Sequence, residues 1–200
     1  MARQTGFAHP QRVKSEAQIA LHQMWLAGGR KFSHLFSPSL ERMPVATTHP
    51  VHVSVTLAFA ESSDFECLVA IRIEAMRESL ERIGRFDAIR ARERFRAGFS
   101  PEQTRHIIVA GERIGFVVLK AQGDELLLDH LYVKPGAQGQ GIGAAVLAHV
   151  FAEADEQALS VRVGALRESA SNRFYLRHGF QLVERGEFDN YYTRPSRNAL

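Results

Sequence analysis

Three closely spaced glycines form the motif with the clearest chemistry. An apolar stretch over 126–133 leads into a break at Pro135, and then come Gly139, Gly141 and Gly143. Glycines let backbone N–H groups approach an anion because no Cβ stands in the way. The first N–H groups of a helix have no partner within the helix, and the helix dipole favours negative charge there. A strand, a glycine-rich turn and a helix in this order predict a site for an anion, and we expect a pyrophosphate.

The spacing of the glycines decides which pyrophosphate ligand fits. A nucleotide P-loop needs Lys followed by Ser or Thr after its last glycine, and neither follows here. A dinucleotide fingerprint needs Gly-x-Gly-x-x-Gly, whereas these glycines are each two residues apart. Residues 138–143 (QGQGIG) instead resemble Gln/Arg-x-x-Gly-x-Gly/Ala, the acyl-CoA loop of the GNAT superfamily of N-acetyltransferases. Residues 131–135 (LYVKP) are similar to that superfamily's fourth strand. A glycine-rich turn that binds no ligand is the alternative.

A second motif supports the resemblance. Residues 173–180 (RFYLRHGF) look like the superfamily's Phe-Tyr-x-x-x-Gly-Phe segment. The resemblance implies that Tyr175 is the general acid that protonates the thiolate of coenzyme A, and a phenol with a pKa of about 10 can do so. A tyrosine that only packs beside Phe174 is the alternative. Asn172 lies one helical turn from Tyr175, and we expect it to bind the pantetheine arm, although the commonest pattern of the superfamily has its asparagine at the position of Glu168.

By the same resemblance, acetyl-CoA is the cosubstrate and is held mostly by the main chain. Backbone N–H groups of the loop surround the pyrophosphate, and the pantetheine arm pairs with the edge of the preceding strand as an added strand would. A backbone N–H near Val133 then polarises the thioester carbonyl. The residues that we expect to bind the cofactor are Leu131, Tyr132, Val133, Gln138, Gly139, Gln140, Gly141, Ile142, Gly143, Ala144 and Asn172.

Asp129 is the candidate for the group that receives the proton of the amine. Several members of the superfamily place a base at a position that matches 127 or 129, and Leu127 cannot titrate. Strand alternation predicts that 127, 129, 131 and 133 share one face and that His130 lies on the other. An Asp with an ordinary pKa of about 4 is a weak base for an ammonium, so it would act through a water or attract the cation. A polar strand residue without a catalytic role is the alternative.

Further candidates surround the expected acceptor site. Glu78, Arg85 and Asp87 lie near a junction of two helices that covers the acceptor in relatives, while Tyr191 and Tyr192 either shape the pocket or pack. No cysteine lies in either motif, so we expect direct attack by the amine without an acyl-enzyme. The only cysteine, Cys67, is expected to be a small core residue. No residues stand at metal-ligand spacing, so no metal is expected.

The elements that must position these residues follow from residue 51 onward. Hydrophobic periodicity predicts the order βααβββαβαββ, an α/β fold with a mixed, mostly antiparallel twisted sheet flanked by helices, as in the GNAT fold. We place the acetyltransferase domain at 50–200. The expected strands are 51–57, 105–110, 113–121, 126–133, 159–165, 180–187 and 188–193, and the expected helices are 65–83, 87–95, 142–151 and 170–178.

Composition limits the other classes of function. The 200 residues carry a net charge of +3, but residues 1–49, an expected flexible extension, hold six Lys or Arg against two Glu. The rest has no basic excess, so we expect no nucleic-acid partner. No stretch is apolar enough for a membrane span or a signal peptide, and a cytoplasmic location is expected.

The expected activity is therefore an acetyl-CoA-dependent N-acetyltransferase that acts on a small-molecule or peptide amine, with a homodimer through edge strands as one possible state. A non-catalytic CoA-binding or sensor module of the same fold is the alternative. A third hypothesis is a protein that binds nucleic acid or another partner through the basic 1–49 arm. Fold alone does not select the acceptor.

Overall fold

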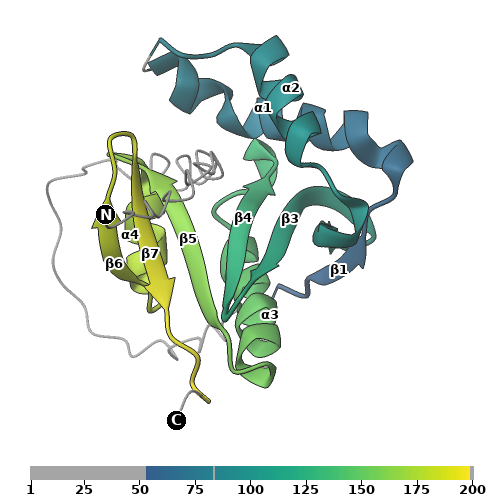
Figure 1. Ribbon diagram of the computed structural model, residues 1–200. Coiled ribbons are helices and arrows are strands. Elements are labelled where there is room, and N and C mark those ends of the chain that lie inside the picture. The colour runs from purple at the N-terminus through teal and green to yellow at the C-terminus, as the bar shows by residue number, and fades with distance from the viewer. Residues whose placement is uncertain (1–52, 83, 199–200) are drawn as a thin grey trace, which may run out of the picture.

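A single mixed sheet runs through the computed structural model, which describes residues 53–82 and 84–198 (Figure 1). The order within the sheet is β1-β2-β3-β4-β5-β7-β6, and every neighbouring pair is antiparallel except β4 and β5. This confirms the expected mixed, mostly antiparallel sheet. The strands are β1 Thr56–Phe59, β2 Thr104–Val109, β3 Glu112–Gln122, β4 Glu125–Val133, β5 Ser160–Leu166, β6 Gln181–Arg185 and β7 Asp189–Arg194.

The helices begin and end close to where the sequence predicts. Asp87 caps the second helix by accepting a hydrogen bond from the backbone N of Arg90 at 3.0 Å, and Gly84 with φ of 64° follows the first. The expected order of elements is confirmed, while the predicted extension over 1–49 lies outside the described residues. The helices are α1 Phe65–Arg82, α2 Ala88–Gly98, α3 Ile142–Glu156 and α4 Ala170–Arg177, with short 3₁₀ turns at Ser62–Asp64, Pro101–Gln103 and Pro135–Ala137.

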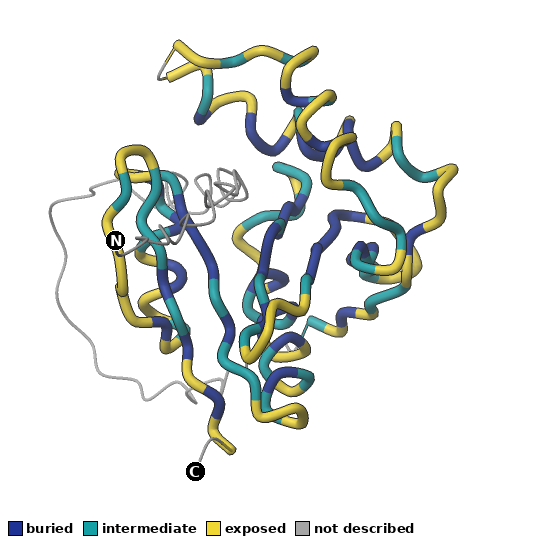
Figure 2. Tube along the Cα trace, in the orientation of Figure 1, coloured by how far each residue is buried: buried dark blue, intermediate teal, exposed yellow. Residues whose placement is uncertain are grey.

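The helices cover both faces of the sheet and create two cores. One core joins α3 and α4 to the sheet through residues such as Leu128, Leu131 and Val146. The other joins α1 and α2 to it through residues such as Phe116 and Tyr132. Burying apolar surface on both faces makes β3, β4 and β5 the buried centre of the sheet (Figure 2), whereas β6 is exposed along its whole length.

A bulge in β4 sets the geometry of the candidate site. Val118 of β3 pairs with His130, but the next residue, Leu119, pairs with Leu128, so Asp129 is the extra residue. Both sides of a bulge keep their pleat, but the pleat shifts by one residue across it. Leu128 and Leu131 therefore face α3 together, and Tyr132 faces α1.

The bulge corrects the expectation that 127, 129, 131 and 133 share one face and that His130 lies on the other. Asp129 contacts Lys120 and lies 3.9 Å from His130, while the His130 ring packs among rings of the core under α1 and α2. Both side chains therefore lie on the α1 and α2 side of the sheet. Simple alternation fails because one extra residue is inserted where the pairing with β3 slips.

The two parallel strands separate at the same place. The pairing of β4 with β5 runs from Glu125 opposite Ser160 to Leu128 opposite Val163 and ends there. Both strands continue beyond that point, to Val133 and Leu166, so they diverge in a V whose open end lies below α1 and α2 (Figure 1).

The prediction for Cys67 is wrong, because this residue is exposed. The buried face of α1 includes Leu68, Arg72, Met76 and Ser79, which recur at three- and four-residue steps. Cys67 lies off that stripe. The prediction relied on the residue type and its apolar neighbours in the sequence, whereas the helical periodicity leaves Cys67 outside the buried face.

Candidate active site

The turn that joins β4 to α3 has the backbone that the glycine motif predicts. Gly139 and Gly141 adopt positive φ values of 78° and 81°, in the left-handed region that favours glycine. Gly141 is the N-cap of α3, and no side chain caps it. The first N–H groups of the helix are thus left for another acceptor. A Cβ built on either glycine meets no heavy atom within 4 Å, so the backbone here lies in the open.

Side chains of the same turn hold it against the end of β4. Gln138 donates from Nε2 to the carbonyl of Val133 at 2.8 Å, and Gln140 donates to the carbonyl of Gly136 at 3.3 Å. The backbone N of Lys134 donates to the carbonyl of Ile114 on β3 at 2.8 Å. These bonds fix the helix N-terminus next to the diverging end of β4, where a bound anion and an extended arm could be continuous.

Tyr175 lies in the core on the other side of the sheet from α1. It is fully buried, and its ring contacts those of Phe174, Phe180 and Tyr192. Because it is part of the core that α3 and β5 share, the structure brings it to the β5 side of the V.

Asp129 is ion-paired within the protein. Its Oδ2 accepts a hydrogen bond from Lys120 Nζ at 2.6 Å, and the residue is only 6 % exposed. Asp129 therefore already has one cationic partner, and the ammonium of an acceptor would have to share the carboxylate with Lys120.

His130, beside it, is held neutral. Burial lowers its pKa from 6.5 to about 3, and the nearby charges of Arg72 and Lys120 act in the same direction, against the opposing effect of Asp129. Its buried Nδ1 has no hydrogen-bond partner among the described residues. The imidazole thus contributes shape and an aromatic surface, and accepts a proton only at low pH.

The side-chain amide of Asn172 is hydrogen-bonded to other residues of the protein. Its Nδ2 donates to the carbonyls of Leu166 and Ser169, both at 2.8 Å, and its Oδ1 accepts from Asn190 and from the Tyr192 hydroxyl. A side-chain amide can donate two hydrogen bonds and accept two. While these bonds hold, Asn172 ties the loop after β5 to β7 and has no capacity left for a cofactor.

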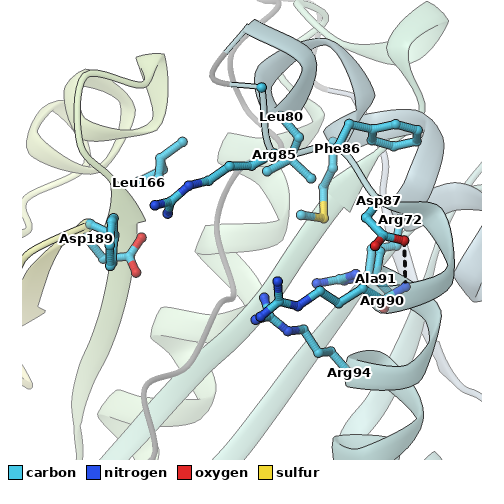
Figure 3. A pocket seen from close by; sticks show the side chains of 13 residues that line it. Arg72, Leu80, Arg85, Phe86, Asp87, Arg90, Ala91, Arg94, Leu166 and Asp189 are labelled. Atoms are coloured by element: carbon cyan, nitrogen blue, oxygen red, sulfur yellow. Dashed lines mark hydrogen bonds between the residues drawn. The ribbon is translucent and has the colours of Figure 1, made fainter.

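A cavity of about 650 Å³ opens between α1, α2 and the turn that joins β6 to β7. Of the three charged residues expected near the acceptor, it contains Arg85 and Asp87 but not Glu78, which pairs with Arg82 at 3.0 Å. Neither Tyr191 nor Tyr192 lines it. Its walls are formed by Arg72, Met76, Leu80, Gly84, Arg85, Phe86, Asp87, Arg90, Ala91, Arg94, Leu166, Phe188 and Asp189 (Figure 3).

Three of the arginines in this cavity were not predicted from the sequence. Arg72 falls within the apolar stripe of α1, and Arg90 and Arg94 lie one turn apart on α2. The one available signal was the arginine-rich composition of the second helix, AIRARERFRAG. Periodicity cannot show which of these arginines share a cavity with the first helix, because that depends on how the two helices cross.

No three or more His, Cys, Asp and Glu side chains within 53–82 and 84–198 group closely enough to hold a metal ion. No helix in that same part of the chain combines the length and the apolar character needed to cross a membrane.

Comparison with known proteins identifies the class of domain. Residues 103–182 match the family model described as an acetyltransferase (GNAT) domain. No curated protein matches the chain. Solved structures do match: the PaiA N-acetyltransferase of Thermoplasma acidophilum, in complex with coenzyme A, has a TM-score of 0.60 at 18% identity, over 71% of this chain and 99% of that one.

Two further solved structures share the fold. A ribosomal-protein alanine N-acetyltransferase from Escherichia coli has a TM-score of 0.57 at 19% identity, over 71% of this chain and 94% of its own. N-acetylglutamate synthase from Neisseria gonorrhoeae, complexed with coenzyme A and N-acetyl-glutamate, has a TM-score of 0.51 at 21% identity, over 72% of this chain and 35% of its own. At these identities the likeness concerns the fold.

Proposed function

This chain contains a GNAT acetyltransferase domain over residues 103–182, and from that premise we propose that it transfers an acetyl group from acetyl-CoA to the amine of an acceptor. The observation that supports this most is the turn before α3. Two glycines with positive φ precede a helix whose N-terminus no side chain caps, beside a strand that has just separated from its neighbour. These features together suit a pyrophosphate followed by an extended arm.

The residues that would hold acetyl-CoA follow from this placement. Backbone N–H groups from Gln138 to Ala144 face the pyrophosphate, and the edge of Leu131–Val133 lines the arm. Gln138 acts indirectly, because its side chain is already bonded to the Val133 carbonyl and holds the turn in place. We omit Asn172 from the set on account of its internal hydrogen bonds. Acetyl-CoA supplies an activated acyl group; the rest of the chemistry concerns protons.

The chain offers one group on each side of the V for those protons. On the β5 side, the Tyr175 hydroxyl donates a proton to the leaving thiolate. On the β4 side, Asp129, which accepts a hydrogen bond from Lys120, attracts the ammonium of the acceptor, and this ammonium passes a proton to a water before the neutral amine attacks the thioester. An amine that arrives from the cavity between α1 and α2 meets Asp129 on the same side of the sheet.

The test is release of free thiol from acetyl-CoA in the presence of a panel of amines. Tyr175→Phe should lower kcat by roughly 100-fold or more, the effect of losing a general acid, while acetyl-CoA still binds. Tyr191→Phe is the matched control, because that ring lies near Arg162 and does not line the cavity. Equal turnover by the wild type and Tyr175→Phe would remove the acid role.

The same assay separates the alternative function. Saturable binding of acetyl-CoA without acetyl transfer to any amine would favour a CoA-binding module that is not an enzyme. Burial of Tyr175 and the ion pair at Asp129 are the observations that keep this alternative open.

A further inference from the structure

The cavity between α1 and α2 is lined by four arginines and only two carboxylates. Arg85, Arg90 and Arg94 extend into it from the helix junction and from α2 (Figure 3), and Arg72 lines it from α1. Of the carboxylates, Asp87 already accepts the backbone N–H of Arg90 as the cap of α2. The cavity therefore has an excess of positive charge, although the sequence from residue 50 onward has no basic excess.

Arg72 is the most informative of the four. It is 2 % exposed, and its Nη1 donates to the carbonyl of Ala91 at 2.8 Å. Its buried Nε has no hydrogen-bond partner in the described part of the chain, and no carboxylate there forms an ion pair with it. A buried cation without a counter-charge is costly, so its presence calls for a ligand that supplies one.

The exposed arginines point to the same ligand. Arg90 has no ion pair or side-chain hydrogen bond among the described residues, although a partner one helical turn away is common for such a residue. Arg85 lies over the ring of Phe188 at 4.3 Å, which holds its guanidinium at the cavity wall. Planar guanidinium groups that line one cavity suit carboxylate or phosphate oxygens.

We propose that the acceptor is a small amine that also carries an anionic group, a carboxylate or a phosphate, and that Arg72, Arg85 and Arg90 bind this anion. That the ligand is an amine rests on the proposed acetyl transfer, whereas that it carries an anionic group rests on the arginines of the cavity. A cavity of about 650 Å³ has the size of a small-molecule site. Leu166, at the diverging end of β5, forms part of its wall, so a ligand anchored there reaches the V.

The anion is not the pyrophosphate of the cosubstrate. No residue of the turn before α3 lines the cavity, and the turn follows β4 on the far side of the V from the β6–β7 turn. Acetyl-CoA and the acceptor anion thus occupy different positive regions, one made of backbone N–H groups and one made of side chains.

The experiment compares matched acceptors by calorimetric titration of the full chain saturated with CoA. Each L-amino acid is paired with its carboxamide, and phosphoethanolamine is paired with ethanolamine. We expect the anionic member of at least one pair to bind about tenfold more tightly than its neutral partner, the effect of a charged hydrogen bond. The two arms show whether carboxylate or phosphate is preferred.

Variants assign the preference to the cavity. Arg90→Gln and Arg85→Gln should each reduce it and leave the affinity for CoA unchanged. Arg96→Gln is the control: it makes the same change on the same helix, at a residue that does not line the cavity. The proposal would be overturned if the neutral member of each pair bound as tightly as the anionic one, or if no anionic member bound. It would also be overturned if the preference for the anion survived in the variant that combines Arg85→Gln with Arg90→Gln.

Acetyl transfer measured on the same pairs keeps the two claims apart. Anion-dependent binding without transfer would support this site and remove the proposed function. Transfer to neutral amines with no preference for their anionic partners would support the function and overturn this inference.

Discussion

Replacing His130 by Phe should remove a large part of the acid sensitivity of the fold. The imidazole is 12 % exposed and lies 5.5 Å from the ring of Phe95 and 5.4 Å from that of Tyr132. Its Nδ1 makes no hydrogen bond to a described residue, and its Nε2 is 3.9 Å from Asp129. A phenyl ring in this place loses no close hydrogen bond, so His130→Phe should be at least as stable as the wild type near neutral pH.

The magnitude follows from the pKa of His130, which burial lowers from 6.5 to about 3. Below pH 6.5 the unfolded chain binds a proton at this histidine that the folded chain does not bind. The wild type therefore loses stability as pH falls, at about 1.36 kcal/mol per pH unit. Between pH 6.5 and about pH 5 the loss amounts to about 2 kcal/mol, and it continues until the pH approaches 3.

The assay is urea unfolding followed by far-ultraviolet circular dichroism, for both proteins, near pH 7.5 and near pH 5. His106, His149 and His178 are present in both proteins, so their contributions cancel in the difference. The free energy of unfolding of the wild type should fall by about 2 kcal/mol more than that of His130→Phe. If the two proteins lose stability in parallel, the reasoning about the burial of His130 is wrong.

Two further predictions concern the frame around the site. Gly115→Ala should destabilise the protein by roughly 3 kcal/mol or more in the same unfolding assay, because its Cβ would lie 2.2 Å from the carbonyl oxygen of Tyr132 on β4. Gly98→Ala, whose Cβ would meet nothing nearer than 3.6 Å, should leave the stability almost unchanged, and an equal effect of the two would contradict this. Arg194→Met should destabilise the protein near pH 7, because the Arg194 guanidinium, which donates to both Asp155 oxygens, is the main cause that lowers the pKa of that carboxyl from 3.8 to about 2. A carboxyl whose pKa is lowered by folding stabilises the protein above pH 3.8. The difference in the free energy of unfolding between the wild type and Arg194→Met should therefore shrink as the pH falls from 3.8 towards 2. A difference that stays constant over this range would refute the prediction.

The sequence predicted the order of elements because each has a local signal. Alternation marks the strands, Asp87 caps α2, and the glycines after β4 mark a turn with two positive φ values, a conformation that glycine favours. The bulge has no such signal, since it arises from the slip between β3 and β4. The adjacent polar residues Asp129 and His130, within an otherwise apolar strand, are the one feature that could have indicated it.

The candidate site was predictable where it depends on one segment. The glycine turn and the position of Tyr175 follow from contiguous motifs. The arginine-lined cavity does not, because α1, the helix junction, α2 and the β6–β7 turn each contribute to it. Asn172 shows the converse: its place one helical turn before Tyr175 suggested a contact with the cofactor, whereas its hydrogen bonds to Leu166 and Tyr192 depend on contacts between β5, α4 and β7.

The central claim is that acetyl-CoA binds at the turn before α3, and calorimetric titration tests it most directly. The wild type should bind acetyl-CoA saturably and Gly141→Glu should not, because a carboxylate would stand where the pyrophosphate is held. Gly123→Glu is the matched control, since Gly123 also has a positive φ, of 63°, and open space around it, but lies in the turn before β4. Binding by the wild type and Gly123→Glu alone would support the account. No binding by the wild type, or equal binding by Gly141→Glu, would contradict it.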